Sequence, residues 1–468
     1  MAKKIVIIGA GSLGFSSRLT ADILTYAGTR DAHFALVDVD HERLAFAEQI
    51  AKRIFKEGGY SGATVSATAN RAEALPGADF VITSILVGGY EAIQLEIDIA
   101  KKYGIDQCIG DTLTPGGIMR CLRTLPVLQE VAHDVMRLCP KAHVLNYTNP
   151  MGMLTLGMLQ AEPRLKLVGL CHSVQGTSHE WARRLGVEMA DVNYECAGIN
   201  HQAFFTRYEK DGVDLLPRIR QLAENPEIWH GDSTRMEYVK HFGFPVTESS
   251  GHVSEYNWWF RKNATTVAQY CDNSKNSWNG GHGYIKTLYD RPEWREEMRK
   301  RASWEKPVKL ERSVEYGSQI INAVVSGEKT VIYGNVMNGG LISNLPADGV
   351  VEVACLVDRN GLQPVAYGKL PPHLAALNRA QMAVQELAVA AVAQRDPELV
   401  FQAMAFDPLT AMSCTLDQIR AMTRELMAAH KKWTPIMEGR LPGEKPLMFT
   451  AKAAKVEAHH DQAEENMG

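Results

Sequence analysis

The chain has 468 residues, of which 45% are hydrophobic and 22% are charged, and its formal net charge is −4. This length is sufficient for a large buried core in about two to three domains. The balanced charge argues against nucleic acid as the main partner, because phosphate binders carry a clustered excess of positive side chains. No apolar run reaches about 18 residues, so we expect no membrane span and no membrane partner.

The eight cysteines are spread along the chain and form no Cys-x-x-Cys pair. In a chain of this length such cysteines are typical of reduced thiols rather than of a disulfide framework. The apolar run Ile5–Ile8 ends at Gly9, and no small-residue cleavage site follows it, so we expect no signal peptide. Together these features predict a cytoplasmic globular protein.

Short apolar runs alternate with helical stretches through the first 200 residues. The predicted strands are Ile5–Ile8, Phe34–Asp38, Asp79–Thr83, His143–Tyr147 and Leu167–Leu170. The predicted helices between them are Ser12–Tyr26, Glu42–Phe55 and Pro126–Leu138. This alternation predicts an α/β fold whose residues 1–195 form a Rossmann-like, doubly wound parallel sheet.

The pattern loosens after residue 200. Sheet returns between Asn335 and Asp358, and long helices are predicted at 370–394 and 417–430. We therefore predict a C-terminal α+β domain over residues 196–450 that contributes to the substrate site, the metal site and subunit contacts. Residues 451–468 lack an apolar stripe, so we expect a frayed or disordered tail.

A glycine-rich motif follows the first predicted strand and opens the first predicted helix. It consists of Gly9, Ala10, Gly11, Ser12, Leu13 and Gly14. In a dinucleotide site the first glycine permits a tight turn, the second lets the backbone approach the pyrophosphate, and the third lets helix and strand pack closely. Asp38 ends the second predicted strand, where a carboxylate binds ribose hydroxyls and repels a 2′-phosphate. The motif therefore predicts NAD binding; the alternative is a glycine-rich turn on a sheet that binds no nucleotide.

Cysteine and histidine residues follow the last predicted strand of this half. Cys171 and His172 come directly after Leu170, and His201 lies thirty residues beyond Cys171. A thiolate and an imidazole can hold a divalent metal ion, with substrate oxygens or water as further ligands. Neighbours in an extended strand point to opposite faces, so we expect only one of Cys171 and His172 to bind the metal. The alternative is a buried cysteine and a core histidine.

Three further polar residues are candidates for the site. Asp111 lies in a loop where its carboxylate could bind sugar hydroxyls, or it caps a turn. Asn149 precedes Pro150 at a strand end and either contacts a ligand or forms an Asx turn. Tyr256 could act as a base if a nearby cation lowers its pKa from about 10; the alternative is a half-buried tyrosine with a satisfied hydroxyl.

These motifs occur in one order along the chain. They comprise Gly9–Gly14, Asp111–Arg120, Asn146–Pro150, Gly169–Thr177, Ala197–His201, Thr247–Ser250, Glu255-Tyr256, Tyr333–Val336, Val351–Asp358 and His373–Leu377. With them the chain resembles glycoside hydrolase family 4, the NAD- and metal-dependent glycosidases, from about Lys4 to Trp433. The resemblance implies an architecture similar to that of lactate and malate dehydrogenases.

The residues after the metal-binding cysteine distinguish substrate classes within this family. Cys171-His172-Ser173-Val174 is similar to the α-galactosidases, whereas the 6-phospho-glycosidases carry Asn or Asp after the cysteine and the galacturonidases carry Cys-His-Glu-Val. The resemblance therefore implies hydrolysis of terminal, non-phosphorylated α-D-galactosides. The alternatives are an α-galacturonidase or α-glucosidase, a plain NAD-dependent dehydrogenase, and a non-catalytic NAD-bound sugar sensor.

The resemblance also implies a cofactor, a metal and a reaction. NAD would accept a hydride from C3 of the sugar, and Mn²⁺ or another divalent metal, held by Cys171 and His201, would polarise the resulting carbonyl group. Tyr256 would remove the C2 proton. The leaving group would then depart from C1, water would add, and the hydride would return.

For His172, Asn149 and Asp111 the resemblance implies roles in the site. His172 would protonate the leaving group, although it could instead bind the substrate or NAD. Asn149 would contact substrate and cofactor, and Asp111 would contact the sugar or order its loop. The resemblance further implies a homodimer or homotetramer.

Overall fold

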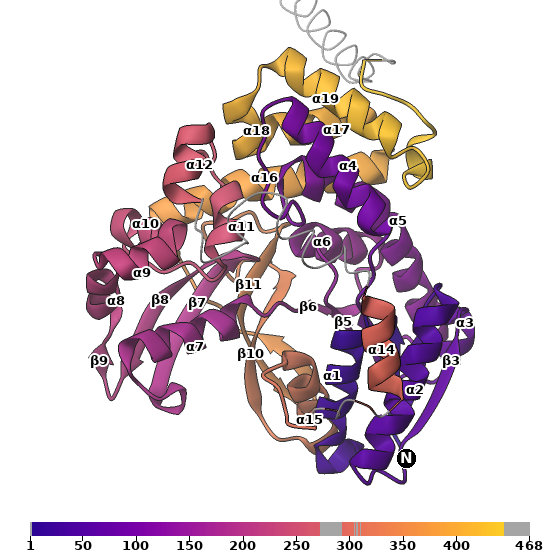
Figure 1. The fold of residues 1–468 in the computed structure, drawn as a ribbon. Helices are drawn as coiled ribbons and strands as arrows, with labels where there is room; N and C mark the ends of the chain where they lie inside the picture. Colours follow the sequence, from indigo (N-terminus) through magenta and orange to yellow (C-terminus); the bar gives the residue numbers. More distant parts are fainter. Residues whose placement is uncertain (1, 272–292, 304, 306–307, 309, 444–468) are drawn as a thin grey trace, which may run out of the picture.

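The computed structural model describes residues 2–271, 293–303, 305, 308 and 310–443. The predicted tail at 451–468 lies outside these residues. Twelve strands of the described chain form one sheet, in the order β3-β2-β1-β4-β5-β6-β10-β11-β7-β8-β9, with β12 paired to β11 (Figure 1). The first six strands of this order are parallel, and the others are antiparallel.

The parallel half of the sheet matches the predicted strands closely. Its strands are β1 (Lys4–Ile8), β2 (His33–Val37), β3 (Thr64–Thr68), β4 (Phe80–Thr83), β5 (His143–Asn146) and β6 (Lys166–Gly169). The sequence analysis does not predict strand β3, because its sequence Thr-Val-Ser-Ala-Thr is mostly polar and none of its residues is fully buried. Strand β1 lies between β2 and β4, so the strand order reverses where the glycine-rich motif leaves the sheet. Open α/β sheets bind ligands at this point.

Helices cover both faces of the parallel half. In β1, Ile5 and Ile7 pack into one core with α1 (Leu13–Leu24) and α2 (His41–Glu57). Val6 and Ile8 pack into a second core with α5 (Thr114–Leu138) and α6 (Met151–Ala161). Because alternate side chains of one strand are buried on both sides, the predicted doubly wound fold is confirmed.

Helix α5 begins well before its predicted start. Pro126 was predicted to be the first residue of this helix, but it lies inside α5, which begins at Thr114. The composition of the segment Thr114-Pro115-Gly116-Gly117 is typical of a loop. In the structure its proline is in the first helical turn, where the missing N–H group costs no hydrogen bond.

The antiparallel strands extend the same sheet beyond β6. They are β10 (Thr330–Met337), β11 (Val350–Asp358), β12 (Gly361–Pro364), β7 (Val192–Ile199), β8 (Gln202–Lys210) and β9 (Val213–Asp214). The predicted sheet at 335–358 is therefore confirmed as β10 and β11. Because one sheet runs through both halves, the division at 195/196 stays a prediction.

The C-terminal helices pack over the second core. They are α16 (Pro372–Gln394), α17 (Pro397–Phe406), α18 (Pro408–Ser413) and α19 (Leu416–Ala429), and they confirm both predicted long helices. In Figure 1 they lie together above the sheet, where α16 contacts α5 and α6 and α19 contacts α4 (Gly89–Lys102).

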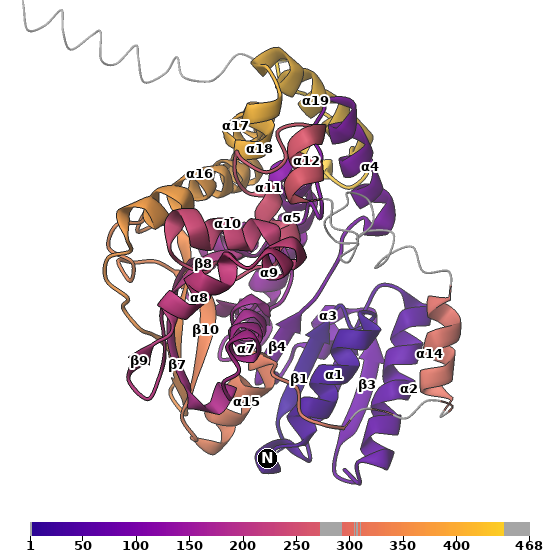
Figure 2. The ribbon, with the colours of Figure 1, turned by 60° about the vertical axis from the view of Figure 1, so that its left-hand side comes forward.

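The remaining helices frame the site or support the sheet. They are α3 (Arg71–Ala74), α7 (Ser173–Leu185), α8 (Leu216–Ala223), α9 (Pro226–Gly231), α10 (Ser233–Phe242), α11 (Ser250–Glu255), α12 (Ala264–Tyr270), α14 (Trp294–Ala302) and α15 (Tyr316–Ser326). Figure 2 shows α14 beside α2, and these two helices are in contact. Among the described helices, none has the length and apolar content needed to cross a membrane.

Candidate active site

The glycine-rich motif forms the turn between β1 and α1. Gly9 has φ +90°, and a Cβ atom at this position would lie 2.0 Å from the backbone oxygen of Ser84. The backbone N–H of Gly11 donates a hydrogen bond to Oδ2 of Asp38 at 2.6 Å, and a Cβ atom on Gly11 would lie equally close to that oxygen. Both positions therefore require glycine, and Asp38 lies against the turn.

The third glycine has a different environment from the one predicted. A Cβ atom at Gly14 would meet no heavy atom within 4 Å, so close helix–strand packing is the wrong reason for this glycine. Ala10 is buried, and Ser12 and Leu13 lie at the start of α1. No acidic side chain lies in the first turn of α1, so its positive end is available to an anion such as a pyrophosphate.

Cys171 and His201 meet at the carboxyl end of the parallel strands. Cys171 lies two residues beyond the end of β6, and His201 lies in the β7–β8 turn with φ +62°, a backbone conformation that non-glycine residues rarely adopt. Sγ of Cys171 lies 3.1 Å from Nε2 of His201. Burial alone raises the pKa of the Cys171 thiol, but His201 and His172 lower it to about 5. The thiolate is therefore the dominant form at neutral pH.

Glu248 completes a group of three potential metal ligands with these two residues. Its Oε2 lies 3.4 Å from Nε2 of His201. One ligand atom from each of Cys171, His201 and Glu248 lies within 4.8 Å of the others. Sequence reasoning did not single out Glu248, although it lies in the quoted motif Thr247–Ser250.

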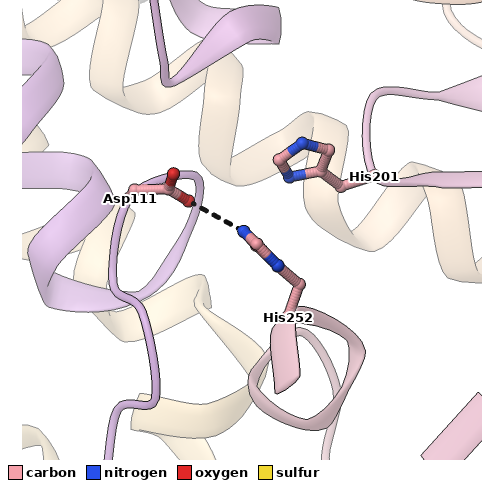
Figure 3. A group of neighbouring side chains, drawn as sticks. All are labelled: Asp111, His201 and His252. Atoms are coloured by element: carbon pink, nitrogen blue, oxygen red, sulfur yellow. Dashed lines mark ion pairs between the residues drawn. The ribbon is translucent and has the colours of Figure 1, made fainter. Parts of the chain in front are cut away.

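A second group contains Asp111, His201 and His252, shown in Figure 3. Nε2 of His252 lies 3.6 Å from Oδ1 of Asp111, and the rings of the two histidines are 4.7 Å apart. Nδ2 of Asn149 donates a hydrogen bond to Oδ2 of Asp111 at 3.3 Å. Burial opposes the charge of Asp111, but His252 and Arg120 hold the pKa of this carboxyl well below its usual range. Sequence reasoning also missed His252.

Tyr256 directly follows α11 and is fully buried, unlike the half-buried tyrosine of the alternative interpretation. Its hydroxyl lies 2.9 Å from Nδ1 of His201, so the thiol, the imidazole and the phenol form one continuous chain of contacts. Burial, together with the charges of Asp111, Glu255 and Glu248, raises the pKa of Tyr256 well above its usual value. A divalent cation near His201 would act in the opposite direction.

His172 does not follow the predicted alternation of strand neighbours. Strand β6 ends at Gly169, so neither Cys171 nor His172 lies in a strand, and the His172 side chain is hydrogen-bonded to that of Cys171. Its Nε2 lies 2.7 Å from Oε1 of Glu315, and its ring lies about 6 Å from the rings of Phe15 and Tyr147. Burial opposes its charge, but Cys171 and Glu315 raise the pKa of His172 to about 10. Since Phe15 directly follows Gly14, His172 lies between the glycine-rich turn and the Cys171–His201 pair.

Several buried polar atoms at the site have no hydrogen-bond partner within the described residues. They are Oδ1 of Asn149 and both side-chain amide atoms of Asn200, which directly precedes His201. Buried polar groups of native proteins are nearly always paired, with protein, water or ligand. These atoms therefore suit a polar ligand such as a sugar.

One loop carries Asp111 into the site, and a carboxylate holds it there. The backbone N–H groups of Cys108, Ile109 and Gly110 donate to Glu255 at 2.6, 3.1 and 2.9 Å. Sequence reasoning did not assign this role to Glu255, since the partners are more than 140 residues apart along the chain.

Together, the fold and the site define a Rossmann-type α/β protein with a buried thiolate–imidazole pair beside a dinucleotide-binding turn. Comparison with known proteins defines it further. Residues 4–187 match "Family 4 glycosyl hydrolase", and residues 196–410 match "Family 4 glycosyl hydrolase C-terminal domain". The chain therefore belongs to glycosyl hydrolase family 4, and the predicted family is confirmed.

Its relatives include two α-galactosidases. One, from Bacillus subtilis (strain 168), is 39% identical over 436 residues, which cover 92% of this chain and 99% of the relative. The other, from Rhizobium meliloti (strain 1021), is 37% identical over 440 residues, which cover 92% and 89%. Among solved structures, a 6-phospho-alpha-glucosidase from gut microorganisms, in complex with NAD and Mn²⁺, has a TM-score of 0.76 at 19% identity and covers 92% of this chain and 99% of that one.

Proposed function

We propose that the protein is an α-galactosidase that hydrolyses terminal, non-phosphorylated α-D-galactosides with the help of NAD and a divalent metal, Mn²⁺ or a similar ion. One observation carries the mechanism: Sγ of Cys171, the ring of His201 and the hydroxyl of Tyr256 follow one another at 3.1 and 2.9 Å. Two α-galactosidases at 37–39% identity support the choice of sugar.

The glycine-rich turn fits NAD. A Cβ atom at Gly9 or Gly11 would collide with Ser84 or Asp38, so the tight turn needs glycine at both positions. Asp38 lies beside the turn, where a ribose hydroxyl could donate to its carboxylate. When bound, NAD supplies a reversible hydride acceptor for C3 of the sugar. The carboxylate of Asp38 would repel a 2′-phosphate, which favours NAD over NADP.

Cys171 and His201 would hold the metal. The Cys171 thiolate is a good ligand for a divalent ion. Burial opposes the charge of His201, but Cys171 and Glu248 raise its pKa to about 10, so Nε2 of His201 would become a ligand when the metal displaces its proton. When bound, the metal supplies Lewis-acid polarisation of the sugar oxygens at C2 and C3.

Tyr256 would remove the C2 proton. When Nε2 of His201 is a ligand, its proton is on Nδ1, which lies 2.9 Å from the phenol oxygen. A hydrogen bond from this N–H group stabilises the phenolate form of Tyr256 and fixes its direction. Full burial of Tyr256 keeps bulk water away from the reacting proton.

His172 would protonate the leaving group. Its Nε2 lies against Glu315, which keeps the imidazolium form available at neutral pH. Asn149 and Asp111, which are hydrogen-bonded to each other, would bind the sugar hydroxyls, and the free Oδ1 of Asn149 can accept one of them.

The proposal also covers the two domains, the cellular compartment and the oligomeric state. Residues 1–195 would bind NAD, and residues 196–450 would complete the substrate and metal sites and the subunit contacts. Seven of the eight cysteines are buried, and all eight are free thiols, which suits a cytoplasmic enzyme. We expect a homodimer or homotetramer, which light scattering on the purified protein would measure.

A panel of p-nitrophenyl glycosides tests the choice of substrate. The α-galactoside should be hydrolysed with a higher kcat/KM than the α-glucoside or the α-galacturonide, in the presence of NAD⁺, Mn²⁺ and dithiothreitol. A preference for either of the other sugars would replace the α-galactosidase by a sister activity. Net formation of NADH at 340 nm would instead indicate a dehydrogenase.

A further inference from the structure

Glu248 has its two carboxylate oxygens in different surroundings. Oε1 accepts a hydrogen bond from the backbone N–H of Ser249 at 2.7 Å and lies 3.4 Å from Nδ1 of His252. Oε2 lies 3.4 Å from Nε2 of His201, the same nitrogen that contacts the Cys171 thiol. The protein therefore fixes one oxygen and directs the other at the predicted metal ligands.

The spacing of these atoms matches that of ligands around a single ion. Two ligands that each lie about 2.0–2.3 Å from a metal, at right angles to one another, are about 3 Å apart. Nε2 of His201 is 3.1 Å from Sγ of Cys171 and 3.4 Å from Oε2 of Glu248. Neither distance requires a rearrangement of the backbone before an ion enters.

Charge and ligand type point in the same direction. The Cys171 thiolate and the Glu248 carboxylate together carry two negative charges, which suit a divalent cation in a buried site. Glu248 is 14% exposed and His201 is 3% exposed, counted over their side chains. A carboxylate oxygen also suits Mn²⁺ or Mg²⁺ better than a second soft ligand would.

The second group around His201 is less suited to the ion. Both oxygens of Asp111 already have protein partners: Oδ1 accepts from the Thr112 hydroxyl at 2.7 Å, and Oδ2 accepts from Asn149 at 3.3 Å. Nδ1 of His201 contacts the hydroxyl of Tyr256 at 2.9 Å. We therefore expect Asp111 to serve the sugar rather than the metal.

We propose that Glu248 is the third protein ligand of the divalent metal, so that Cys171, His201 and Glu248 bind it from one side. The hydroxyl oxygens at C2 and C3 of the sugar would supply further ligands. This inference rests on the proposed function in one respect, the presence of a metal at the Cys171–His201 pair.

Direct metal binding tests the inference without an activity assay. The full-length protein would be titrated with Mn²⁺ alone, and free Mn²⁺ would be measured by electron paramagnetic resonance. Loss of an outer-shell partner weakens metal binding about 10- to 100-fold, so Glu248→Gln, which removes a ligand, should weaken Mn²⁺ binding about 100-fold or more. Asp111→Asn and the exposed control Glu224→Gln should each remain within about threefold of the wild type, a difference of about 0.7 kcal/mol.

The absorption spectrum of bound Co²⁺ separates a ligand from a neighbour of a ligand. Glu248→Gln should shift the d–d bands of bound Co²⁺, while the thiolate-to-cobalt charge-transfer band from Cys171 persists. If Glu248→Gln does not fold, as judged by circular dichroism, Glu248→Asp provides the same comparison with a shorter carboxylate. The d–d bands of Co²⁺ bound to Glu248→Asp should also shift.

The outcomes distinguish the role of Glu248 from the existence of the metal site. Unchanged d–d bands and Mn²⁺ affinity in the Glu248 variant would overturn the role of Glu248 alone. A larger loss of affinity in Asp111→Asn than in Glu248→Gln would overturn it in favour of the second group. Failure of the wild type to bind Mn²⁺, or unchanged binding in Cys171→Ser, would contradict the metal site itself and with it the proposed function.

Discussion

Glu255 offers the sharpest test of how the chain positions Asp111. Its carboxylate is fully buried and accepts three backbone N–H groups, those of Cys108, Ile109 and Gly110. Asp111 is the next residue, so these bonds fix the loop that carries it. In Glu255→Gln, the new amide group can accept bonds on its oxygen alone, and its NH₂ group must face at least one backbone N–H.

The cost follows from the bonds that are lost. A hydrogen bond to a charged group contributes about 1.5–3 kcal/mol, and an unpaired buried donor costs about 1–3 kcal/mol. Loss of one such bond and weakening of the other two therefore gives about 2–4 kcal/mol of local destabilisation. At 1.36 kcal/mol per factor of ten, this corresponds to a roughly 30- to 1000-fold larger equilibrium population of the open loop.

Hydrogen–deuterium exchange measures this opening directly. Peptides that span residues 105–113 should exchange about 30- to 1000-fold faster in Glu255→Gln, while peptides from α2 should not change. The KM for p-nitrophenyl α-galactoside should also rise, because Asp111 loses its fixed position. The exposed control Glu224→Gln should match the wild type in both assays. If residues 108–110 exchange at the same rate in Glu255→Gln as in the wild type, the proposed role of Glu255 is refuted.

Other substitutions give simpler tests. Gly9→Ala would place a Cβ atom 2.0 Å from the Ser84 oxygen at a positive φ, so its melting temperature should fall and its NAD⁺ affinity, measured by fluorescence titration, should drop at least about tenfold. At Gly14, which lies in α1, a Cβ atom would meet no heavy atom within 4 Å, so the stability of Gly14→Ala should equal that of the wild type or exceed it by up to about 1 kcal/mol; a large loss would contradict the open surroundings of this glycine. Burial raises the pKa of Asp407 to about 6 from 3.8, so its stabilising contribution is full below pH 3.8 and is lost as the pH rises through about 6. Between pH 4 and pH 7 the free energy of unfolding, measured with urea, should fall less in Asp407→Asn than in the wild type, by up to about 3 kcal/mol. The same fall in both proteins would contradict the raised pKa of Asp407.

Much of the parallel sheet could be predicted from the sequence, because buried parallel strands are continuous apolar runs. Val81 and Ile82 of β4 and Val144 and Leu145 of β5 are examples. The edge strand β3 lacks such a run, since exposed and half-buried side chains alternate along it. Prediction of the start of α5 failed for a different reason: Pro and Gly favour turns locally, but tertiary packing fixed them in a helix.

The site was predictable where its signal is local. The turn at Gly9–Gly14 and the segment after β6 could be recognised because consecutive residues carry the chemistry. Glu248 and His252 required the structure, since their positions depend on how the segment around α11 folds against the β7–β8 turn. Their spacing of four residues in the sequence was the one local signal, and it is common in helices that bind nothing.

The central claim is that hydrolysis depends on both a nucleotide and a metal. Release of p-nitrophenol from its α-galactoside should be measured with NAD⁺, Mn²⁺ and dithiothreitol together, and with each omitted in turn after gel filtration with a chelator. The account predicts that activity is lost without NAD⁺ or Mn²⁺, falls without the reductant as Cys171 is oxidised, and returns when each is added back. Full activity after both the nucleotide and the metal are removed would contradict it, because a conventional pair of carboxylates would then have to perform the reaction.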